Sequence, residues 1–226
     1  KVDFTKVEFH QDENIKFACG IDSDRKLHCW GDNSYNIHNV PTGTYSQLAV
    51  GLHSACALSE EGEVTCWGDN SHQQSDPPEG IFRHIDVSDT FGCGIENDSS
   101  ITCWGDEMIV LETLIPYHKQ YSQIAVGYSY ACALQFNGEI TCFGMEGNEN
   151  QYGELEPPEG NFVSIESGEY HSCALREDGG IACWGKNDLG QSDVIEGVYK
   201  DISIGLFDTC AFEEGGDLRC WGSGNE

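Results

Sequence analysis

Twelve cysteines are the residues in this sequence best suited to chemistry, and they fall into six pairs whose members lie ten positions apart. Cysteine pairs can bind zinc, exchange thiols and disulfides, or form structural disulfides. Zinc ligands usually lie about two to four residues apart, and no histidine recurs beside these pairs, so a metal site fits poorly. Redox dithiols usually use a CxxC spacing, which is absent here. The six pairs are Cys19 and Cys29, Cys56 and Cys66, Cys93 and Cys103, Cys132 and Cys142, Cys173 and Cys183, and Cys210 and Cys220.

Each cysteine pair belongs to a repeated phrase, such as CALREDGGIACWG from Cys173. Two apolar runs flank a turn of Gly, Asn, Asp and Glu, which predicts a β-hairpin. Both cysteines of a pair are equally far from the turn, so they face each other across the strands at a distance that suits a disulfide. We therefore expect one disulfide within each of the six hairpins, and each would contribute roughly 2–3 kcal/mol in the chain-entropy description.

A further strand precedes each hairpin, because segments such as YSQLAVG from Tyr45 alternate apolar and polar residues. A repeat of three or four strands cannot bury its faces alone, and the first cysteines recur every 37 to 41 residues. This period favours an all-β fold, a β-propeller with six blades, over a linear β-solenoid. We expect a single domain over 1–226. Its repeats are 4–44, 45–81, 82–120, 121–161, 162–198 and 199–226.

Charge and composition restrict the partners and the compartment. The formal net charge of −28 disfavours nucleic acid and anionic membrane surfaces, and it favours a cationic partner or simply solubility. The paired cysteines indicate an oxidising compartment, and no apolar run is long enough to span a membrane. The sequence begins with Lys1 and shows no signal peptide, so we expect a mature or trimmed secreted chain.

The repeated unit resembles the repeat of the regulator of chromosome condensation family. SIESGEYHSCALREDGGIACWGKNDLGQS, residues 164–192, is its fullest copy. The disulfide-bearing form is similar to extracellular members such as Crinkly-type receptor ectodomains and, more distantly, to beta-lactamase inhibitor protein II. The resemblance implies a propeller, typically with seven blades, so seven is the alternative to six. The founding members act on a small GTPase and chromatin, which we do not expect of an acidic chain with this cysteine content.

Residues that differ between the repeats are the candidates for ligand binding. The three positions that end two residues before each first cysteine vary most, and the family often has histidine at the last of them, as His171 is here. An aromatic, acid-rimmed set would suit a protein or a sugar, whereas packing between blades is the alternative. The repeated tryptophan after the second cysteine is expected to pack between blades. The candidate ligand-binding residues are Phe17, His53, Phe91, Tyr128, Tyr130, Tyr170, His171 and Phe207.

Motifs for catalysis are absent from the sequence: it has no HExxH, P-loop or GxSxG. The segment WGDNS occurs twice, but a β-turn explains Asp-Asn-Ser better than calcium does, so we expect no metal and no cofactor. Asn97 begins an N-glycosylation sequon at a predicted hairpin tip.

The sequence thus predicts a secreted, non-catalytic module that binds an extracellular protein or a glycan. An inhibitor of a secreted enzyme and a lectin are the alternatives within binding. An enzyme with a site in a central channel and a structural spacer are expected less.

Overall fold

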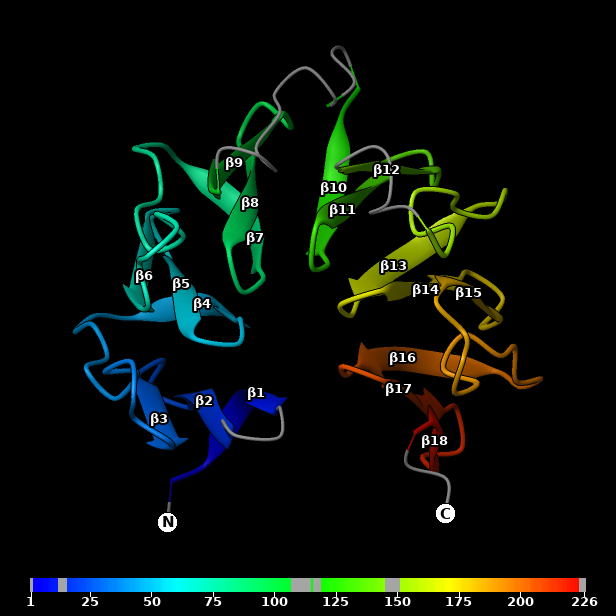
Figure 1. Cartoon of the computed structure of the whole chain (residues 1–226), viewed down its shortest axis with the longest axis horizontal. Coiled ribbons are helices and arrows are strands. Elements are labelled where there is room, and N and C mark those ends of the chain that lie inside the picture. The colour runs from blue at the N-terminus through cyan, green and yellow to red at the C-terminus, as the bar shows by residue number, and fades with distance from the viewer. Residues whose placement is uncertain (1, 12–15, 107–114, 116–118, 145–150, 224–226) are drawn as a thin grey trace. The chain divides into compact units, whose positions relative to one another are not determined.

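The computed structural model describes residues 2–11, 16–106, 115, 119–144 and 151–223 (Figure 1). Within these residues every regular element is a strand, and the strands form six antiparallel sheets of three strands each. The prediction of an all-β propeller of six repeats is confirmed, because each repeat forms one sheet, or blade. The described residues contain no helix that could cross a membrane.

The chain divides into two compact units, Lys1–Thr113 and Leu114–Glu226, with three blades in each. A single domain over the whole chain stays a prediction. The blades of unit 1 are β1 (Phe4–Gln11), β2 (Lys16–Asp22) and β3 (Leu27–Gly31); β4 (Tyr45–Val50), β5 (Ser54–Ser59) and β6 (Val64–Gly68); and β7 (Phe82–Val87), β8 (Phe91–Glu96) and β9 (Ile101–Gly105). The blades of unit 2 are β10 (Tyr121–Val126), β11 (Tyr130–Gln135) and β12 (Ile140–Gly144); β13 (Phe162–Ser167), β14 (His171–Arg176) and β15 (Ile181–Gly185); and β16 (Tyr199–Ile204), β17 (Asp208–Glu213) and β18 (Leu218–Gly222).

The second and third strands of every blade form the predicted hairpin, and the two cysteines of each pair are direct partners in its register. All six predicted disulfides are present, with Cα–Cα distances of 4.0 to 4.1 Å. The first strand of each blade starts with an aromatic residue and then shifts register by a bulge, as between Tyr45 and Gln47. The bulge re-aims the following side chains, and this shift recurs in all six blades.

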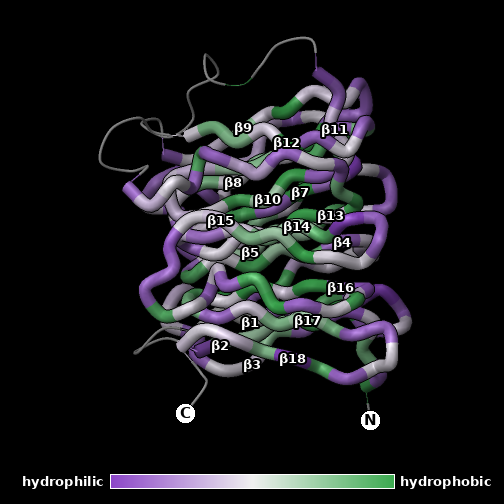
Figure 2. Tube along the Cα trace, turned by 90° about the vertical axis from the view of Figure 1, so that its right-hand side faces the viewer, coloured by the Kyte–Doolittle hydropathy of each residue, from purple (hydrophilic) through white to green (hydrophobic). Residues whose placement is uncertain are grey.

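The apolar cores lie between successive blades of a unit. In unit 1, Phe17, Ile21 and Leu27 of the first blade pack with Leu48 and Trp67 of the second. In the hydropathy colouring of Figure 2 the hydrophobic green concentrates in the strands, and the connecting loops are mostly purple. A blade therefore stabilises its neighbour directly, as expected for a repeat protein.

The tryptophan that follows each second cysteine ties its blade to the preceding one. The indole N–H of Trp67 donates to the carbonyl of Ile37 at 2.8 Å, and that of Trp184 donates to the carbonyl of Glu154 at 3.0 Å. Trp104 makes the corresponding bond. Trp30, in the first blade, is instead 41% exposed. The tryptophan packs between blades, as expected, wherever a described loop of the preceding blade reaches it.

Candidate functional site

Each blade has a three-residue segment that ends two residues before its first cysteine, and we call this segment the link. The six links are 15–17, 52–54, 89–91, 128–130, 169–171 and 206–208. They follow the first strand of the blade and lead into the hairpin, so the rigid sheet sets the position of their backbone.

A glycine after the repeated tryptophan holds the middle of the link in place. Gly68 has φ +105°, and a Cβ there would lie 2.5 Å from the carbonyl oxygen of His53. Gly185 has φ +92° and the same 2.5 Å approach to the carbonyl oxygen of Tyr170. The next backbone N–H, that of Lys186, donates to the same Tyr170 carbonyl at 2.7 Å. Only glycine fits this left-handed, closely packed position.

Four of the eight candidate ligand-binding residues are buried. The exposed fractions are 5% for Phe17, 2% for Phe91, 3% for Tyr130 and 0% for His171. Each stands at the last position of its link and points into the packed interior, so a ligand outside the blades does not reach it. For these four the structure favours packing between blades, the alternative that the sequence left open, and we do not retain them as proposed ligand contacts.

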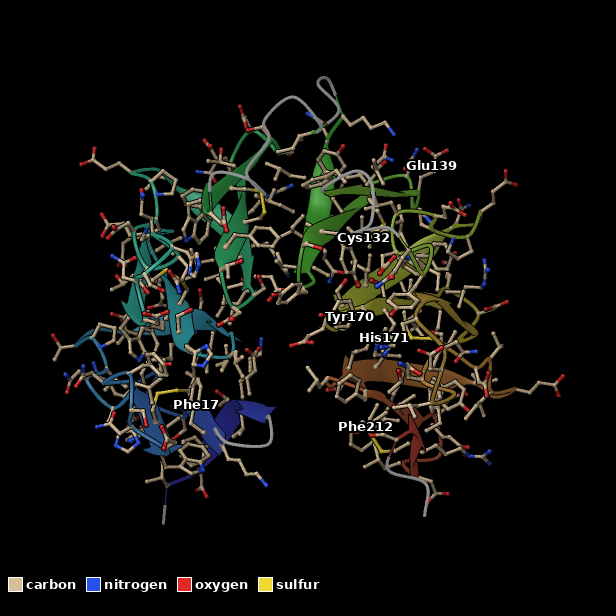
Figure 3. The ribbon with its side chains drawn as sticks, in the orientation of Figure 1. Phe17, Cys132, Glu139, Tyr170, His171 and Phe212 are labelled. Carbon is tan, nitrogen blue, oxygen red and sulfur yellow. A yellow bond between two sulfur atoms is a disulfide. The ribbon has the colours of Figure 1, made fainter. Side chains whose placement is uncertain are left out.

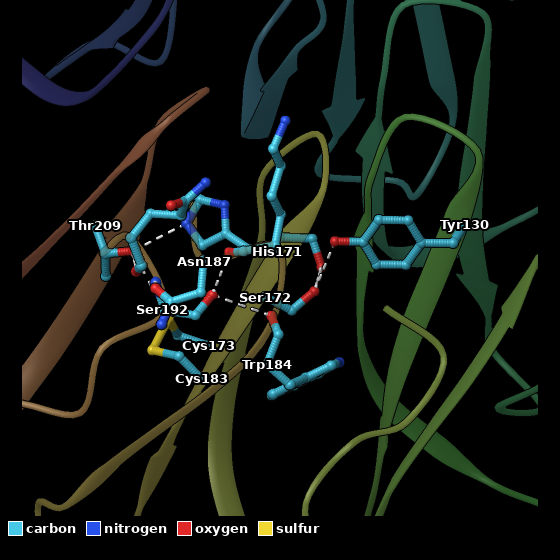
Figure 4. The surroundings of a disulfide bond; sticks show 12 residues. Tyr130, His171, Ser172, Cys173, Cys183, Trp184, Asn187, Ser192 and Thr209 are labelled. Carbon is cyan, nitrogen blue, oxygen red and sulfur yellow. Dashed lines mark hydrogen bonds between the residues drawn. A yellow bond between two sulfur atoms is a disulfide. The ribbon is translucent and has the colours of Figure 1, made fainter. Parts of the chain in front are cut away.

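Polar bonds in unit 2 show this packing role (Figure 4). The hydroxyl groups of Tyr130 and Ser172, in neighbouring blades, lie 2.9 Å apart, and burial raises the pKa of Tyr130. His171 Nε2 lies 3.0 Å from Thr209 Oγ1 of the next blade. Burial lowers the pKa of His171 to about 4 against the opposing charge of Asp208, so this imidazole is neutral at pH 7. A neutral, buried imidazole suits an interior hydrogen bond between blades.

The other four candidates, which precede the buried position in their links, are at least partly accessible. Tyr128 is 40% exposed, and His53, Tyr170 and Phe207 are half-buried. Figure 3 labels Tyr170 beside its buried neighbour His171 at the start of β14. Adjacent residues in an extended chain point to opposite sides, which explains why the link presents one residue and buries the next.

In unit 1 the accessible link residue His53 lies within a small polar cluster. Its ring packs edge-on against Tyr35 of the preceding blade, with centroids 4.4 Å apart. Its Nδ1 lies 2.5 Å from Oδ1 of Asp89 in the following blade. The side chains of His53 and Asp89 are 17% and 24% exposed. We call Tyr35, His53 and Asp89 the histidine patch.

In unit 2 the accessible link residue Tyr170 lies among aromatic rings instead. Its ring centroid is 5.6 Å from that of Tyr128 and 6.2 Å from that of Tyr152. The ammonium nitrogen of Lys186 lies 4.9 Å from the Tyr152 centroid and 5.4 Å from the Tyr170 centroid. We call Tyr128, Tyr152, Tyr170 and Lys186 the tyrosine patch.

Sequence reasoning missed Tyr35, Tyr152 and Lys186, because it searched the links and not the loops that follow the hairpins. A loop alignment would have found the two tyrosines. Tyr35 lies two residues before the buried Ile37, and Tyr152 lies two residues before the buried Glu154. Ile37 and Glu154 are the residues whose carbonyls accept the tryptophan bonds, so the same anchor positions both tyrosines.

The side chain at this anchor position also organises the loop. Gln74 Oε1 accepts the N–H of His72 at 2.8 Å, and Gln191 Oε1 accepts the N–H of Leu189 at 2.9 Å. In the tyrosine patch Glu154 Oε2 accepts the N–H of Tyr152 at 3.0 Å. These local bonds fix the loop backbone two residues before the anchor and therefore fix the direction of the Tyr152 side chain.

Carboxylates in the loops serve turns. Asp32 Oδ1 accepts the backbone N–H of Ser34 at 2.8 Å, and this bond, with the Ser34 hydroxyl, lowers the pKa of Asp32. Asp69 accepts both the N–H and the hydroxyl of Ser71. This is the use of Asp-Asn-Ser that a β-turn predicts. Among the described residues no three His, Cys, Asp or Glu side chains group as metal ligands would.

Two comparisons of sequence agree with this repeat structure. The regulator of chromosome condensation (RCC1) repeat matches residues 16–37, 45–74 and 162–191. An X-linked retinitis pigmentosa GTPase regulator homolog of Caenorhabditis elegans is 30% identical over 83 residues, which is 32% of this chain and 6% of that protein. The chain thus corresponds to a small part of that relative.

Solved structures show the same fold over most of the chain. The ectodomain of the Physcomitrella patens receptor kinase CR4 has a TM-score of 0.81 and 24% identity, and the match covers 99% of this chain and 63% of that one. The CRINKLY WD40 ectodomain of the Arabidopsis thaliana receptor kinase ACR4 has a TM-score of 0.80 and 23% identity, with 99% and 80% covered. Yeast RCC1 (Prp20), solved bound to Kap60, has a TM-score of 0.72 and 18% identity, with 95% and 69% covered. The repeat matches, the six three-stranded blades and their disulfides identify the chain as an RCC1-like repeat propeller.

Proposed function

We propose that this chain is an extracellular, non-catalytic module that binds a protein through the accessible link residues and the loops beside them. The observation that carries the proposal is the division within each link. The last position is turned inward in Phe17, Phe91, Tyr130 and His171 and holds the blades together, whereas the position before it is accessible in His53 and Tyr170. Residues that vary between copies are thus available where packing does not require them.

Three further observations support this function. Six disulfides are typical of an oxidising, extracellular environment. Two structures similar to this chain are receptor kinase ectodomains, and a third, yeast RCC1, is bound to a protein. Tyrosine is among the residues that contribute most at protein interfaces, and the net charge of −28 favours a basic partner.

The test compares chains that differ only at the patches. Wild-type protein and the variants Tyr170→Ala, His53→Ala and Val163→Ala are immobilised and exposed to extracellular fluid of the source organism. Val163 is 50% exposed on β13, outside the links, and is the control. We expect a protein that wild type and Val163→Ala retain, and that at least one patch variant loses by tenfold or more in affinity.

Several outcomes would overturn the proposal. Retention that does not depend on either patch would remove its basis. Retention that disappears when glycans are enzymatically removed would make the module a lectin. If the captured partner is a secreted enzyme that loses activity in a one-to-one complex, the chain is an inhibitor, which is a special case of the proposed protein binding.

A further inference from the structure

Lys186 occupies an unusual place for a cation in this acidic protein. Blades 1 to 3 have Asp32, Asp69 and Asp106 directly after the Trp-Gly of the hairpin, whereas blade 5 has Lys186. The side chain of Lys186 is 21% exposed and lies over two tyrosine rings rather than extending into solvent. Its one described ion pair is with Asp188 at 3.7 Å, whose side chain is 68% exposed. An ion pair this exposed holds a lysine only weakly.

The rings around Lys186 come from three separate segments of unit 2. Tyr128 belongs to the link of blade 4, Tyr152 to the loop after its hairpin, and Tyr170 to the link of blade 5. The Tyr128 and Tyr170 rings are tilted by 38°, and the Tyr152 and Tyr170 rings by 73°. Rings inclined in this way direct more than one negative π-face toward the same space, which is the geometry that attracts a cation.

The patch remains accessible on the side of Tyr128, which is 40% exposed. The rest of it is fixed from below. The Tyr152 loop is tied by Glu154, and the Tyr170 carbonyl accepts the Lys186 N–H at 2.7 Å. The backbone of Lys186 is therefore held, while its four-carbon side chain is free to leave the rings without disturbing the fold. A fixed aromatic site beside a movable internal cation is the arrangement of a receptor with its own plug.

We propose that the tyrosine patch is a receptor for a lysine or arginine side chain of the partner protein, and that Lys186 occupies it in the free state and competes with that side chain. The internal ammonium group shows which chemistry the rings accept. The net charge of −28 favours the approach of a basic segment over an acidic one. The inference rests on the proposed function only in taking the partner to be a protein.

The alternative use of the same residues gives the opposite sign in a simple experiment. If Lys186 were itself the recognition group, for a carboxylate or another anion, its removal would weaken binding. If Lys186 is a plug, its removal strengthens binding of a cation. The variant Lys186→Gln therefore separates the two possibilities, and Lys200→Gln is a matched control, because it makes the same change in net charge at an exposed residue of β16.

The probes are two short peptides, acetyl-Gly-Arg-Gly-amide and the same peptide with uncharged citrulline, titrated against the full chain and followed by NMR of the tyrosine rings. We expect Lys186→Gln to raise the affinity for the arginine peptide by about 3- to 10-fold over Lys200→Gln, in line with the strength of a cation–π contact. Tyr170→Leu should abolish binding of the arginine peptide, and the citrulline peptide should not bind. The thermal midpoint of each variant confirms that it is folded.

Equal or weaker binding of the arginine peptide by Lys186→Gln, relative to Lys200→Gln, would overturn the proposal. So would arginine binding that survives in folded Tyr170→Leu, or a citrulline peptide that binds equally well. Failure of the inference is distinguishable from failure of the proposed function. The peptide titration needs no partner, whereas the capture experiment scores retained proteins whatever side chain they insert.

Discussion

The histidine patch of unit 1 and the tyrosine patch of unit 2 occupy corresponding positions in their repeats, yet they present different chemistry. Each places a loop tyrosine, Tyr35 or Tyr152, against an accessible link residue, His53 or Tyr170. In unit 1 the link residue then meets the carboxylate of Asp89, and in unit 2 a lysine meets the rings. The first patch is thus polar and paired within itself, and the second is an aromatic surface with a cation over it.

The difference teaches that the frame of the repeat does not depend on the identity of the exposed residues. The indole of Trp67 or Trp184 bonds to a backbone carbonyl of the preceding loop, and this bond is the same whether the anchor residue is Ile37 or Glu154. The glycine after the tryptophan likewise contacts a backbone carbonyl of the link. Because backbone atoms make these contacts, the side chains at the patches are able to vary without loss of the fold.

The largest expected effect comes from breaking this common frame. An alanine at Gly68 or Gly185 would adopt a strained left-handed conformation and place its Cβ 2.5 Å from a link carbonyl oxygen. We expect both Gly68→Ala and Gly185→Ala to lower the free energy of unfolding by about 2–4 kcal/mol, because strain and a backbone clash act together. Urea unfolding of the two variants measures the effect.

Gly215→Ala is the control for this pair, because nothing lies within 4 Å of a Cβ at that glycine. It should change the free energy of unfolding by no more than about 0.5 kcal/mol. If Gly68→Ala and Gly185→Ala differ strongly from each other, the two patches do not share one frame and the comparison fails. If both are destabilised equally but only Gly185→Ala also weakens arginine-peptide binding, the comparison is sharpened.

The sequence predicted the scaffold well because its signals are local. Cysteines equally far from a turn must face each other in a hairpin, so the pairing of Cys173 with Cys183 followed from spacing alone. The alternation in YSQLAVG predicted β4 correctly. The three-strand blade repeats these local rules six times, and each copy strengthens the prediction.

The candidate site was predicted less completely because it depends on contacts between blades. Spacing in the link did not show that Tyr130 and His171 turn inward while Tyr128 and Tyr170 stay accessible. That choice follows from partners in other blades, such as Ser172 for Tyr130. Lys186 gave no signal by itself, since only the fold brings it over Tyr152.

A smaller effect concerns pH, because each unit contains a histidine whose pKa burial lowers to about 4, His84 in unit 1 and His171 in unit 2. Lys6 and Arg83 contribute to the lowering at His84. Above the ordinary value of 6.5 both states of each imidazole are neutral, so pH has no effect through them. As pH falls from 6.5 toward 4 the unfolded chain binds the proton first, and stability decreases. For the fully buried His171 the loss is on the order of 2–3 kcal/mol.

Unfolding of His171→Asn and His84→Gln at pH 7 and pH 4.5 tests this expectation. Carboxylate titration adds the same background to every protein, so the comparison uses the change relative to wild type. We expect the decrease in stability between the two pH values to shrink most in His171→Asn, and less in His84→Gln, because His84 is only half-buried. Replacement of the exposed His38 by Asn is the control. An undiminished decrease in both variants would show that these imidazoles are not the groups that titrate.

The smallest effect separates the ion pairs of the two patches. The side chains of His53 and Asp89 are 17% and 24% exposed, whereas those of Lys186 and Asp188 are 21% and 68% exposed. A double-mutant cycle on His53→Gln and Asp89→Asn should give a coupling energy of about 0.5–1 kcal/mol, and the cycle on Lys186→Gln and Asp188→Asn should give a value near zero. Weak coupling at Lys186 is what a displaceable plug requires. A Lys186–Asp188 coupling as large as that of His53–Asp89 would mean that the lysine is held in place by its own ion pair, and the two patches would then be equally closed.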